Sequence, residues 1–171
     1  MIQEGMMRHT MMIREIKSGE LEILEDLLYE AIFQPDPIQR LPREVIHRPE
    51  LRAYIEDWGR SDDLCLVAEL DGRIVGGVWT RVFSETFQGY GWLDHATPEL
   101  AISLFEEYRG QGIGTRLLQE MLQLLRQRGY SRVSLSVSKQ NRAVRLYRDI
   151  GFEVVREEQG EYLMQLWLRE M

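Results

Sequence analysis

A glycine-rich segment in the second half of the chain has the most direct chemical meaning; it reads Arg109-Gly110-Gln111-Gly112-Ile113-Gly114-Thr115. The segment lies between an expected strand over residues 99–104 and an expected helix over residues 112–129. Glycines at alternate positions allow a ligand to approach the backbone closely. The unpaired N–H groups at the start of the helix face the same space and favour an anion there. The pattern therefore predicts a binding site for a phosphate or pyrophosphate group.

Two familiar phosphate-binding loops do not fit this segment. A Walker loop requires Gly-Lys followed by Ser or Thr, and the chain contains no Gly-Lys pair. The dinucleotide-binding fingerprint requires a glycine where Thr115 stands. A nucleotide-phosphate binder is therefore a weak interpretation. The interpretation that needs no ligand is a glycine-rich turn in front of an apolar helix.

A second segment begins at the only asparagine of the chain; it reads Asn141-Arg142-Ala143-Val144-Arg145-Leu146-Tyr147 and is followed by Gly151-Phe152. Together the two segments resemble the paired signatures of the GNAT N-acetyltransferases, with Thr115-Arg116-Leu117-Leu118 completing the acyl-CoA loop. One helix and one strand separate them, as in the family, and residues 97–102 resemble the family's fourth strand. The resemblance is specific over residues 99–154. Over residues 1–83 it rests on the order of the elements alone.

The resemblance implies acetyl-CoA as co-substrate and assigns residues to it. The backbone of residues 102–104 is expected to pair with the pantetheine arm, and the amides of residues 110–115 to hold the pyrophosphate. Asn141 matches the asparagine that helps to hold the cofactor, and it also suits the N-cap of its helix. The implied cofactor-binding residues are Ile102, Ser103, Leu104, Arg109, Gly110, Gln111, Gly112, Ile113, Gly114, Thr115, Asn141 and Tyr147.

Acetyl transfer to an amine requires a neutral amine, a donor for the thioester oxygen and a proton for the departing thiolate. Tyr147 matches the family tyrosine proposed to protonate that thiolate; otherwise it is a core residue whose hydroxyl bonds to the backbone. Glu99 is the best candidate for the base, or for an anchor of the amine, because it lies beside the expected cleft. Otherwise it is a solvated carboxylate at a strand end, and a one-residue shift of the strand would turn it to the other face. No convincing nucleophile is present, so we expect direct transfer.

The acceptor pocket is expected to form from the first helices, the Pro-rich residues 34–49 and residues 84–98. The candidate lining is Trp58, Trp79, Phe87, Tyr90, Trp92, Glu85, Asp94 and His95, although each aromatic residue is also a candidate for plain core. An acidic, aromatic pocket would suit a cationic amine, and the acceptor stays open between small-molecule and peptide amines. A non-catalytic acyl-CoA-binding module is the alternative function. The presence of both Tyr147 and Glu99 favours the enzyme.

The composition is that of a globular protein: of 171 residues, 44% are hydrophobic and 29% charged, with a net charge of −7. The acidic balance argues against nucleic acid or an anionic membrane as a partner. Residues 99–150 nevertheless contain more basic than acidic side chains, which suits an anionic ligand. The histidines are scattered, so no metal is expected. The lone Cys65 lies in an expected buried strand, where packing is its simplest role.

No 18-residue apolar stretch and no signal peptide is apparent, and the single cysteine excludes an internal disulfide. These features predict a cytoplasmic protein without a membrane partner. Dimers are common in the family, so a homodimer is a further expectation.

Hydrophobic periodicity predicts strands over residues 11–17, 64–70, 73–83, 99–104, 132–137, 152–156 and 162–168, and helices over residues 20–33, 49–58, 112–129 and 141–150. Asp71-Gly72 and Gln159-Gly160 predict two hairpins. The helix between the strands at 99 and 132 predicts a parallel crossover. We therefore expect a single domain over residues 1–171, with residues 1–10 disordered. Its class is α/β (α+β): three layers, with about seven strands in a mixed, splayed, mostly antiparallel sheet and about four flanking helices. The cofactor is expected to enter where the strands at 99 and 132 splay.

Overall fold

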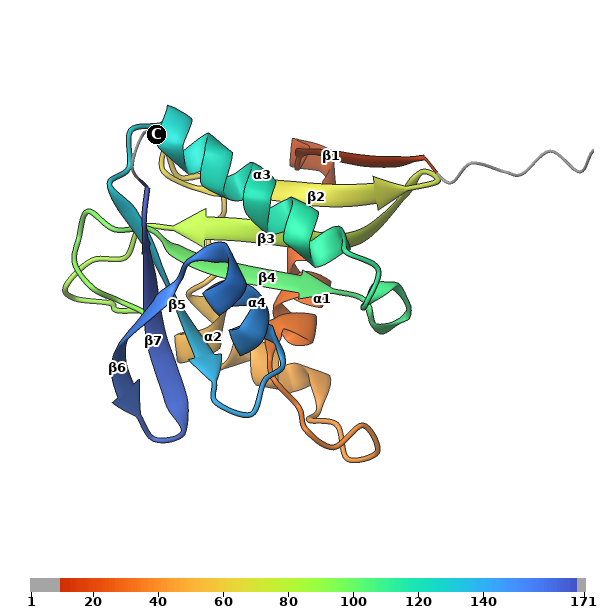
Figure 1. Cartoon of the computed structure of the whole chain (residues 1–171). Helices are drawn as coiled ribbons and strands as arrows, with labels where there is room; N and C mark the ends of the chain where they lie inside the picture. Colours follow the sequence, from red (N-terminus) through yellow and green to blue (C-terminus); the bar gives the residue numbers. More distant parts are fainter. Residues whose placement is uncertain (1–9, 169–171) are drawn as a thin grey trace, which may run out of the picture.

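The computed structural model describes residues 10–168 as one seven-stranded sheet with helices on both faces (Figure 1). The strands are β1 (Met11–Glu15), β2 (Leu64–Leu70), β3 (Arg73–Arg81), β4 (Glu99–Leu104), β5 (Arg132–Ser138), β6 (Glu153–Glu158) and β7 (Glu161–Trp167). Their spatial order is β1-β2-β3-β4-β5-β7-β6. The disorder expected for residues 1–10 falls outside the described residues, apart from Thr10.

Both predicted hairpins form at the predicted turns. Asp71 and Gly72 have positive φ angles of 50° and 79°, and Gln159 and Gly160 have φ angles of 44° and 82°. Two consecutive residues in the left-handed region give a turn whose twist matches that of the flanking strands. The turns therefore connect β2 to β3 and β6 to β7 as antiparallel neighbours.

The helices are α1 (Ile23–Ala31), α2 (Pro49–Arg52), α3 (Ile113–Gln127) and α4 (Ala143–Ile150). The prediction of a helix over residues 49–58 was wrong in length, because α2 ends at Arg52. The buried Arg81 guanidinium donates to the carbonyl oxygens of Ala53 and Glu56, at 2.8 and 2.6 Å, and Asp57 has a φ of 50°. These carbonyl groups therefore bond to a side chain instead of continuing the helix. Among residues 10–168, no helix is long and apolar enough to cross a membrane.

Two apolar cores, one on each face of the sheet, give the expected three layers. On one face α3 buries Leu117, Met121 and Leu125 against the strands, next to the residues of α4. On the other face α1 buries Leu24 and Leu27, among the residues that pack around Trp79 of β3. Figure 1 shows α3 and α4 in front of the sheet, with α1 and α2 behind it.

β4 and β5 are parallel neighbours that pair at a single register position, Glu99 with Ser134. On their other sides the two strands have continuous ladders: β3 pairs with all of β4, and β7 with all of β5. The parallel direction follows from the crossover through α3. The two strands therefore separate toward their carboxyl ends, and the sequence-based prediction of a splay is confirmed.

Close packing between β3 and β4 predicts a position where only glycine fits. A Cβ at Gly76 would lie 2.2 Å from Leu104 Cδ2 and 2.8 Å from the backbone oxygen of Ser103. Because that oxygen cannot withdraw without disturbing the strand pairing, Gly76→Ala should lower the free energy of unfolding by about 2 kcal/mol in urea denaturation. Gly19→Ala is the matched control, since a Cβ at Gly19 meets no atom within 4 Å. Equal losses in the two variants would contradict the packing argument.

Candidate active site

A cavity of about 1010 Å³ opens where β4 and β5 separate. Its walls come from the end of α1 and the residues after it, the end of β4, the glycine-rich loop and the start of α4. The expected site residues that line it are Ile102, Ser103, Leu104, Arg109, Gly110, Gly114, Asn141 and Tyr147. The fold therefore brings the two sequence segments, which are distant along the chain, to one place.

The glycine-rich loop offers unpaired amide groups at the start of α3. Gly110 and Gly112 have φ angles of 75° and 83°, and a Cβ on either would meet no atom within 4 Å. Within residues 10–168, the N–H groups of residues 110–115 donate to no backbone carbonyl. Unpaired N–H groups at the positive end of a helix favour an anion. The loop is therefore able to hold a phosphate group, as its sequence predicts.

Four expected residues of this loop, Gln111, Gly112, Ile113 and Thr115, do not line the cavity. The Ile113 side chain is buried in the core, and the Gln111 side chain donates to the backbone oxygen of Glu107 at 3.2 Å. These residues offer an anion their backbone N–H groups.

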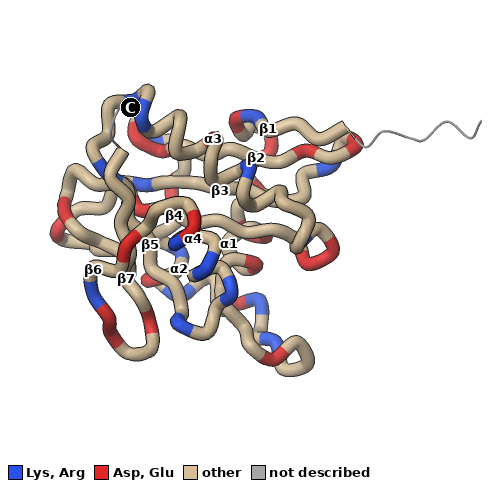
Figure 2. The backbone as a smooth tube through the Cα atoms, viewed as in Figure 1, with Lys and Arg blue, Asp and Glu red and all other residues tan. Residues whose placement is uncertain are grey.

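Three arginine side chains line the cavity: Arg40, Arg109 and Arg142. Glu30 at the end of α1 accepts hydrogen bonds from Arg109 at 3.0 Å and from Arg40 at 3.3 Å. Arg109 also donates to the backbone oxygen of Leu104 at 3.0 Å. Such exposed pairs add little stability, but they hold two cations beside the loop. Figure 2 shows further basic residues around α4, so the surroundings suit a ligand with several negative charges.

Gln34, in the segment after α1, presents an unpaired donor in the cavity wall. Its Oε1 accepts the N–H of Leu41 at 2.7 Å, which fixes the side chain. Its Nε2 is buried and has no hydrogen-bond partner in the described part of the chain. Because an unpaired buried amide is unfavourable, the wall fits a ligand that supplies carbonyl or hydroxyl oxygens.

Asn141 lies just before α4, and Tyr147 lies within the helix. The Oδ1 of Asn141 accepts the N–H of Ala143 at 2.9 Å and so caps the first turn. Tyr147 is buried, with its ring 5.7 Å from that of Phe152 in an edge-to-face arrangement. Burial raises the pKa of Tyr147 well above its ordinary value, so the hydroxyl stays protonated at neutral pH. The interpretation with a backbone hydrogen bond fails, because within residues 10–168 this hydroxyl has no partner.

Glu99 is buried on the face of the sheet that α1 and α2 cover, with 2% of its surface exposed. Its Oε1 accepts hydrogen bonds from the Tyr54 hydroxyl and, at 2.7 Å, from the N–H of Gly91. Burial raises the pKa of this carboxyl group to about 7. The interpretation as a solvated strand-end carboxylate is therefore wrong. Glu99 also does not line the cavity that Tyr147 lines.

The aromatic residues expected around an acceptor mostly pack elsewhere. Trp79 is fully buried, and Trp92 is partly buried against the same core. Trp58 stacks on the guanidinium of Arg81, with 5.1 Å to the ring centroid. Asp94 pairs with Arg132 instead of facing a pocket. These residues therefore belong to the packed framework of the fold, and none of them lines the large cavity.

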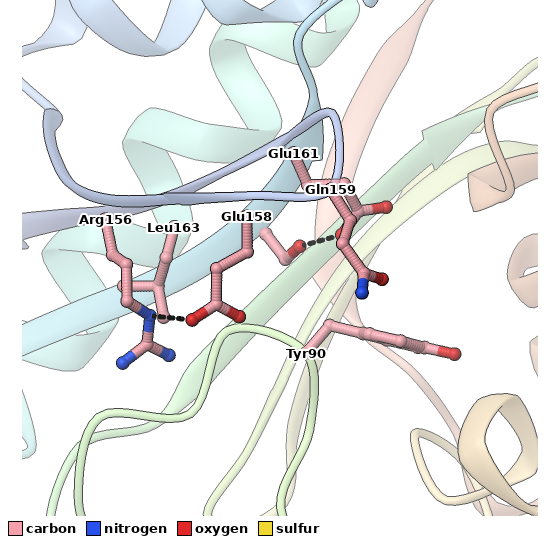
Figure 3. A pocket seen from close by; sticks show the side chains of 7 residues that line it. Tyr90, Arg156, Glu158, Gln159, Glu161 and Leu163 are labelled. Atoms are coloured by element: carbon pink, nitrogen blue, oxygen red, sulfur yellow. Dashed lines mark hydrogen bonds and ion pairs between the residues drawn. The ribbon is translucent and has the colours of Figure 1, made fainter.

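Tyr90 lines a smaller hollow of about 190 Å³ beside the β6–β7 hairpin (Figure 3). Within it, Arg156 pairs with Glu158 at 3.0 Å, and the Ser136 hydroxyl donates to Glu161 at 2.8 Å. Phe87, Glu85 and His95 are exposed on the same loop. Of the expected acceptor lining, Tyr90 thus borders a concave surface.

Cys65 and the acidic residues offer no alternative chemistry in the described residues. Burial raises the pKa of the Cys65 thiol to about 12, which keeps it protonated and unreactive. Over residues 10–168, no group of three or more His, Cys, Asp and Glu side chains is arranged to hold a metal ion.

Sequence reasoning missed Glu30, Gln34, Arg40 and Tyr54. The Pro-rich segment was expected to border the acceptor, whereas Gln34 and Arg40 line the cavity with the glycine loop. Tyr54 meets a partner 45 residues away. The composition of the Pro-rich segment was the available indication for Gln34 and Arg40, whereas nothing in the neighbouring sequence marks Tyr54.

Comparison with known proteins places these features in one family. The model of the Acetyltransferase (GNAT) family matches residues 26–152. Mycothiol acetyltransferase from Saccharomonospora viridis is 33% identical over 105 residues, which cover 60% of this chain and 34% of that protein. An N-alpha-acetyltransferase from Sulfurisphaera tokodaii is 32% identical over 108 residues, which cover 60% of this chain and 64% of that protein. The chain thus spans from about a third to just under two thirds of the length of these relatives.

Solved structures share the fold. The yncA protein of Salmonella typhimurium, solved with its cofactor acetyl-CoA, has a TM-score of 0.68 at 20% identity, covering 95% of this chain and 96% of that one. The paia N-acetyltransferase of Thermoplasma acidophilum, in complex with coenzyme A, has a TM-score of 0.67 at 21% identity. The match covers 91% of this chain and 98% of that one. The family model covers most of the chain, and the glycine loop, Asn141 and Tyr147 surround one cavity in this fold; the chain belongs to the GNAT acetyltransferase family.

Proposed function

We propose that this chain is an acetyl-CoA-dependent N-acetyltransferase that transfers an acetyl group directly to a primary amine. The observation that supports this most is the shared cavity: unpaired loop amides, arginine side chains and the Tyr147 hydroxyl surround it in a GNAT fold. One relative is named a mycothiol acetyltransferase and another an N-alpha-acetyltransferase, so the names point to unlike acceptor molecules. The acceptor class proposed is therefore a primary amine, small or peptidic.

The cavity residues divide between the parts of acetyl-CoA. The amides of residues 110–115, with Arg109, would hold the pyrophosphate. The backbone of residues 102–104 and the free amide of Gln34 would face the pantetheine arm. Arg40 and Arg142 would complement the remaining phosphate charge. When bound, acetyl-CoA supplies an acetyl group on a thioester, which a neutral amine is able to attack.

Tyr147 is the proposed proton donor for the departing sulfur. The surroundings that raise its pKa disfavour any anion there, a thiolate included. Proton transfer from the hydroxyl would neutralise the departing sulfur and move the negative charge to the Tyr147 oxygen, which must then regain a proton from solvent.

Glu99 is the proposed proton acceptor for the attacking amine. A carboxyl group with a pKa of about 7 is close to half ionised at neutral pH, as a general base requires. The segment over residues 89–91 covers it, and this segment must move for the amine to reach it. If Glu99 stays covered, the chain is instead an acyl-CoA-binding module without turnover; its separation from the main cavity favours that second candidate.

The loop predicts a glycine-dependent cofactor site. Gly112→Glu should abolish micromolar binding of acetyl-CoA and CoA in titration calorimetry, because it would add a negative charge to the loop whose amides would hold the pyrophosphate. Gly129→Glu is the matched control: it introduces the same charge at a glycine of nearly the same φ, 82°, with no atom within 4 Å of its Cβ, beyond the far end of α3. Binding that survives in Gly112→Glu would remove the loop from the site.

Removal of the Tyr147 hydroxyl separates catalysis from binding. Tyr147→Phe should lower kcat about 100-fold in a CoA-release assay with an accepted amine, while the Kd for acetyl-CoA changes less than about twofold. Tyr130→Phe, beyond the far end of α3, serves as control and should keep kcat. An unchanged kcat in Tyr147→Phe would exclude it as the acid.

The raised pKa of Glu99 predicts how stability depends on pH. The folded state holds this proton up to about pH 7, against 4.5 for an ordinary glutamate. The associated stability is therefore full below pH 4.5 and is lost as pH rises through 7. Between pH 5 and 8 the wild type should lose about 2 kcal/mol more unfolding free energy than Glu99→Gln, measured by urea denaturation. Glu85→Gln, exposed in the neighbouring loop, should follow the wild type; parallel curves for wild type and Glu99→Gln would contradict the assignment.

A further inference from the structure

A hydrogen-bond network around the carboxyl group of Glu99 on β4 links four segments of the chain. The Tyr54 hydroxyl, beyond α2, donates to its Oε1, and so does the N–H of Gly91 in the loop over residues 84–98. The Tyr54 oxygen in turn accepts the N–H of Tyr90 at 2.9 Å. On β5, the Ser134 hydroxyl donates to the Gly91 backbone oxygen at 2.6 Å. The network ties the loop to both strands at the one position where β4 and β5 pair.

The two oxygens of this carboxyl group are in unlike surroundings. Oε1 has two donors, whereas Oε2 is buried and has no partner in the described residues. A Cβ at Gly89 would lie 1.9 Å from Oε2, so bare backbone covers this atom. Because both donors stabilise charge on Oε1, Oε2 is the atom with lone pairs free to take up a proton.

The full charges that face Glu99 from the neighbouring strands are already paired. Arg81 on β3 lies directly opposite it, and its guanidinium binds Asp63 at 2.8 Å. Asp94 of the loop pairs with Arg132 of β5. Because these charges are paired, burial and the two hydrogen bonds to Oε1 set the proton affinity of Glu99.

Two tyrosines are the other titratable groups around it. Burial raises the pKa of Tyr54 well above its ordinary value, so its hydroxyl remains a donor across the neutral range. Tyr90 is half exposed and faces Glu50, Arg48 and Glu161 instead. The Tyr54 hydroxyl is therefore the side-chain donor that bears on Glu99.

We propose that Tyr54 is the positioning residue of the reaction: its hydroxyl fixes Oε1 of Glu99, so that Oε2 is the oxygen that takes the proton of the acceptor amine once the covering segment over residues 89–91 has moved. This inference rests on the proposed function. In the transfer, the amine nitrogen bonds to the acetyl carbon and the carbon–sulfur bond breaks. Oε2 takes the proton that the nitrogen loses, and the sulfur receives one from Tyr147; Glu99 then releases a proton to solvent and Tyr147 regains one from it.

The test compares Tyr54→Phe with the wild type in two titrations. One is the pH profile of kcat/KM for an accepted amine; the other is the NMR titration of the Glu99 side-chain carboxyl carbon, assigned by its loss in Glu99→Gln. Without the Tyr54 donor the ionised form is less stabilised, so both midpoints should move up by about one pH unit. The effect on kcat/KM should accordingly be about tenfold larger below the midpoint than well above it. The Kd for acetyl-CoA should stay within about twofold.

Tyr29→Phe is the matched control. Tyr29 is buried in the same core, and its hydroxyl donates to the Leu41 backbone oxygen at 2.7 Å. This variant should lose stability without moving either midpoint, so a merely structural effect is recognisable.

Each outcome decides the inference. Both midpoints raised in Tyr54→Phe and neither in Tyr29→Phe supports it. An unmoved NMR midpoint in Tyr54→Phe overturns it, and so does a raised NMR midpoint with an unmoved rate profile. A wild type that acetylates no amine overturns the proposed function instead, and that result is obtained before any variant is made.

Discussion

The single register position at which β4 and β5 pair is the constraint on which the site depends. Parallel strands joined through α3 pair at Glu99 and Ser134 and then separate. Had the ladder continued, the edge of β4 over residues 102–104 would be covered by β5 and no cavity could exist there. Because β3 and β7 complete the ladders on the outer sides, the sheet tolerates this gap without losing its order.

The same junction separates two kinds of surroundings. Toward the carboxyl ends of the strands lies the open cavity with the glycine loop and Tyr147. At the closed end, the loop over residues 84–98 packs so tightly that a Cβ at Gly91 would lie 2.7 Å from the backbone of Leu135. That packing isolates Glu99 from water. The open cavity and the burial of Glu99 under the loop over residues 84–98 are therefore two consequences of one local arrangement.

Much of the fold and of the cofactor site follows from local sequence. The Asp71-Gly72 turn, the apolar face of α3 and the glycines before it each act within a few residues, so periodicity and turn chemistry identify them. The end of α2 could not be predicted, because it depends on Arg81, 25 residues beyond Glu56. The burial of Glu99 likewise depends on Tyr54 and Gly91, which only the folded chain brings together. Tryptophans expected around an acceptor proved to be framework, since composition alone does not distinguish a pocket wall from a core.

Burial acts on the two proposed proton-transfer groups in the same direction but with opposite chemical results. For Tyr147 it raises a pKa that is already high, so the group remains a donor over the physiological range. For Glu99 it raises a low pKa to about 7, which turns an ordinary carboxylate into a base that exchanges protons near neutrality. The two hydrogen bonds to Oε1 oppose that rise and keep the carboxyl group from being locked in its neutral form. The fold thus sets the proton affinity of an ordinary tyrosine and an ordinary glutamate by burying both beside one strand junction. The number of hydrogen-bond donors that reach each oxygen then adjusts the two values separately.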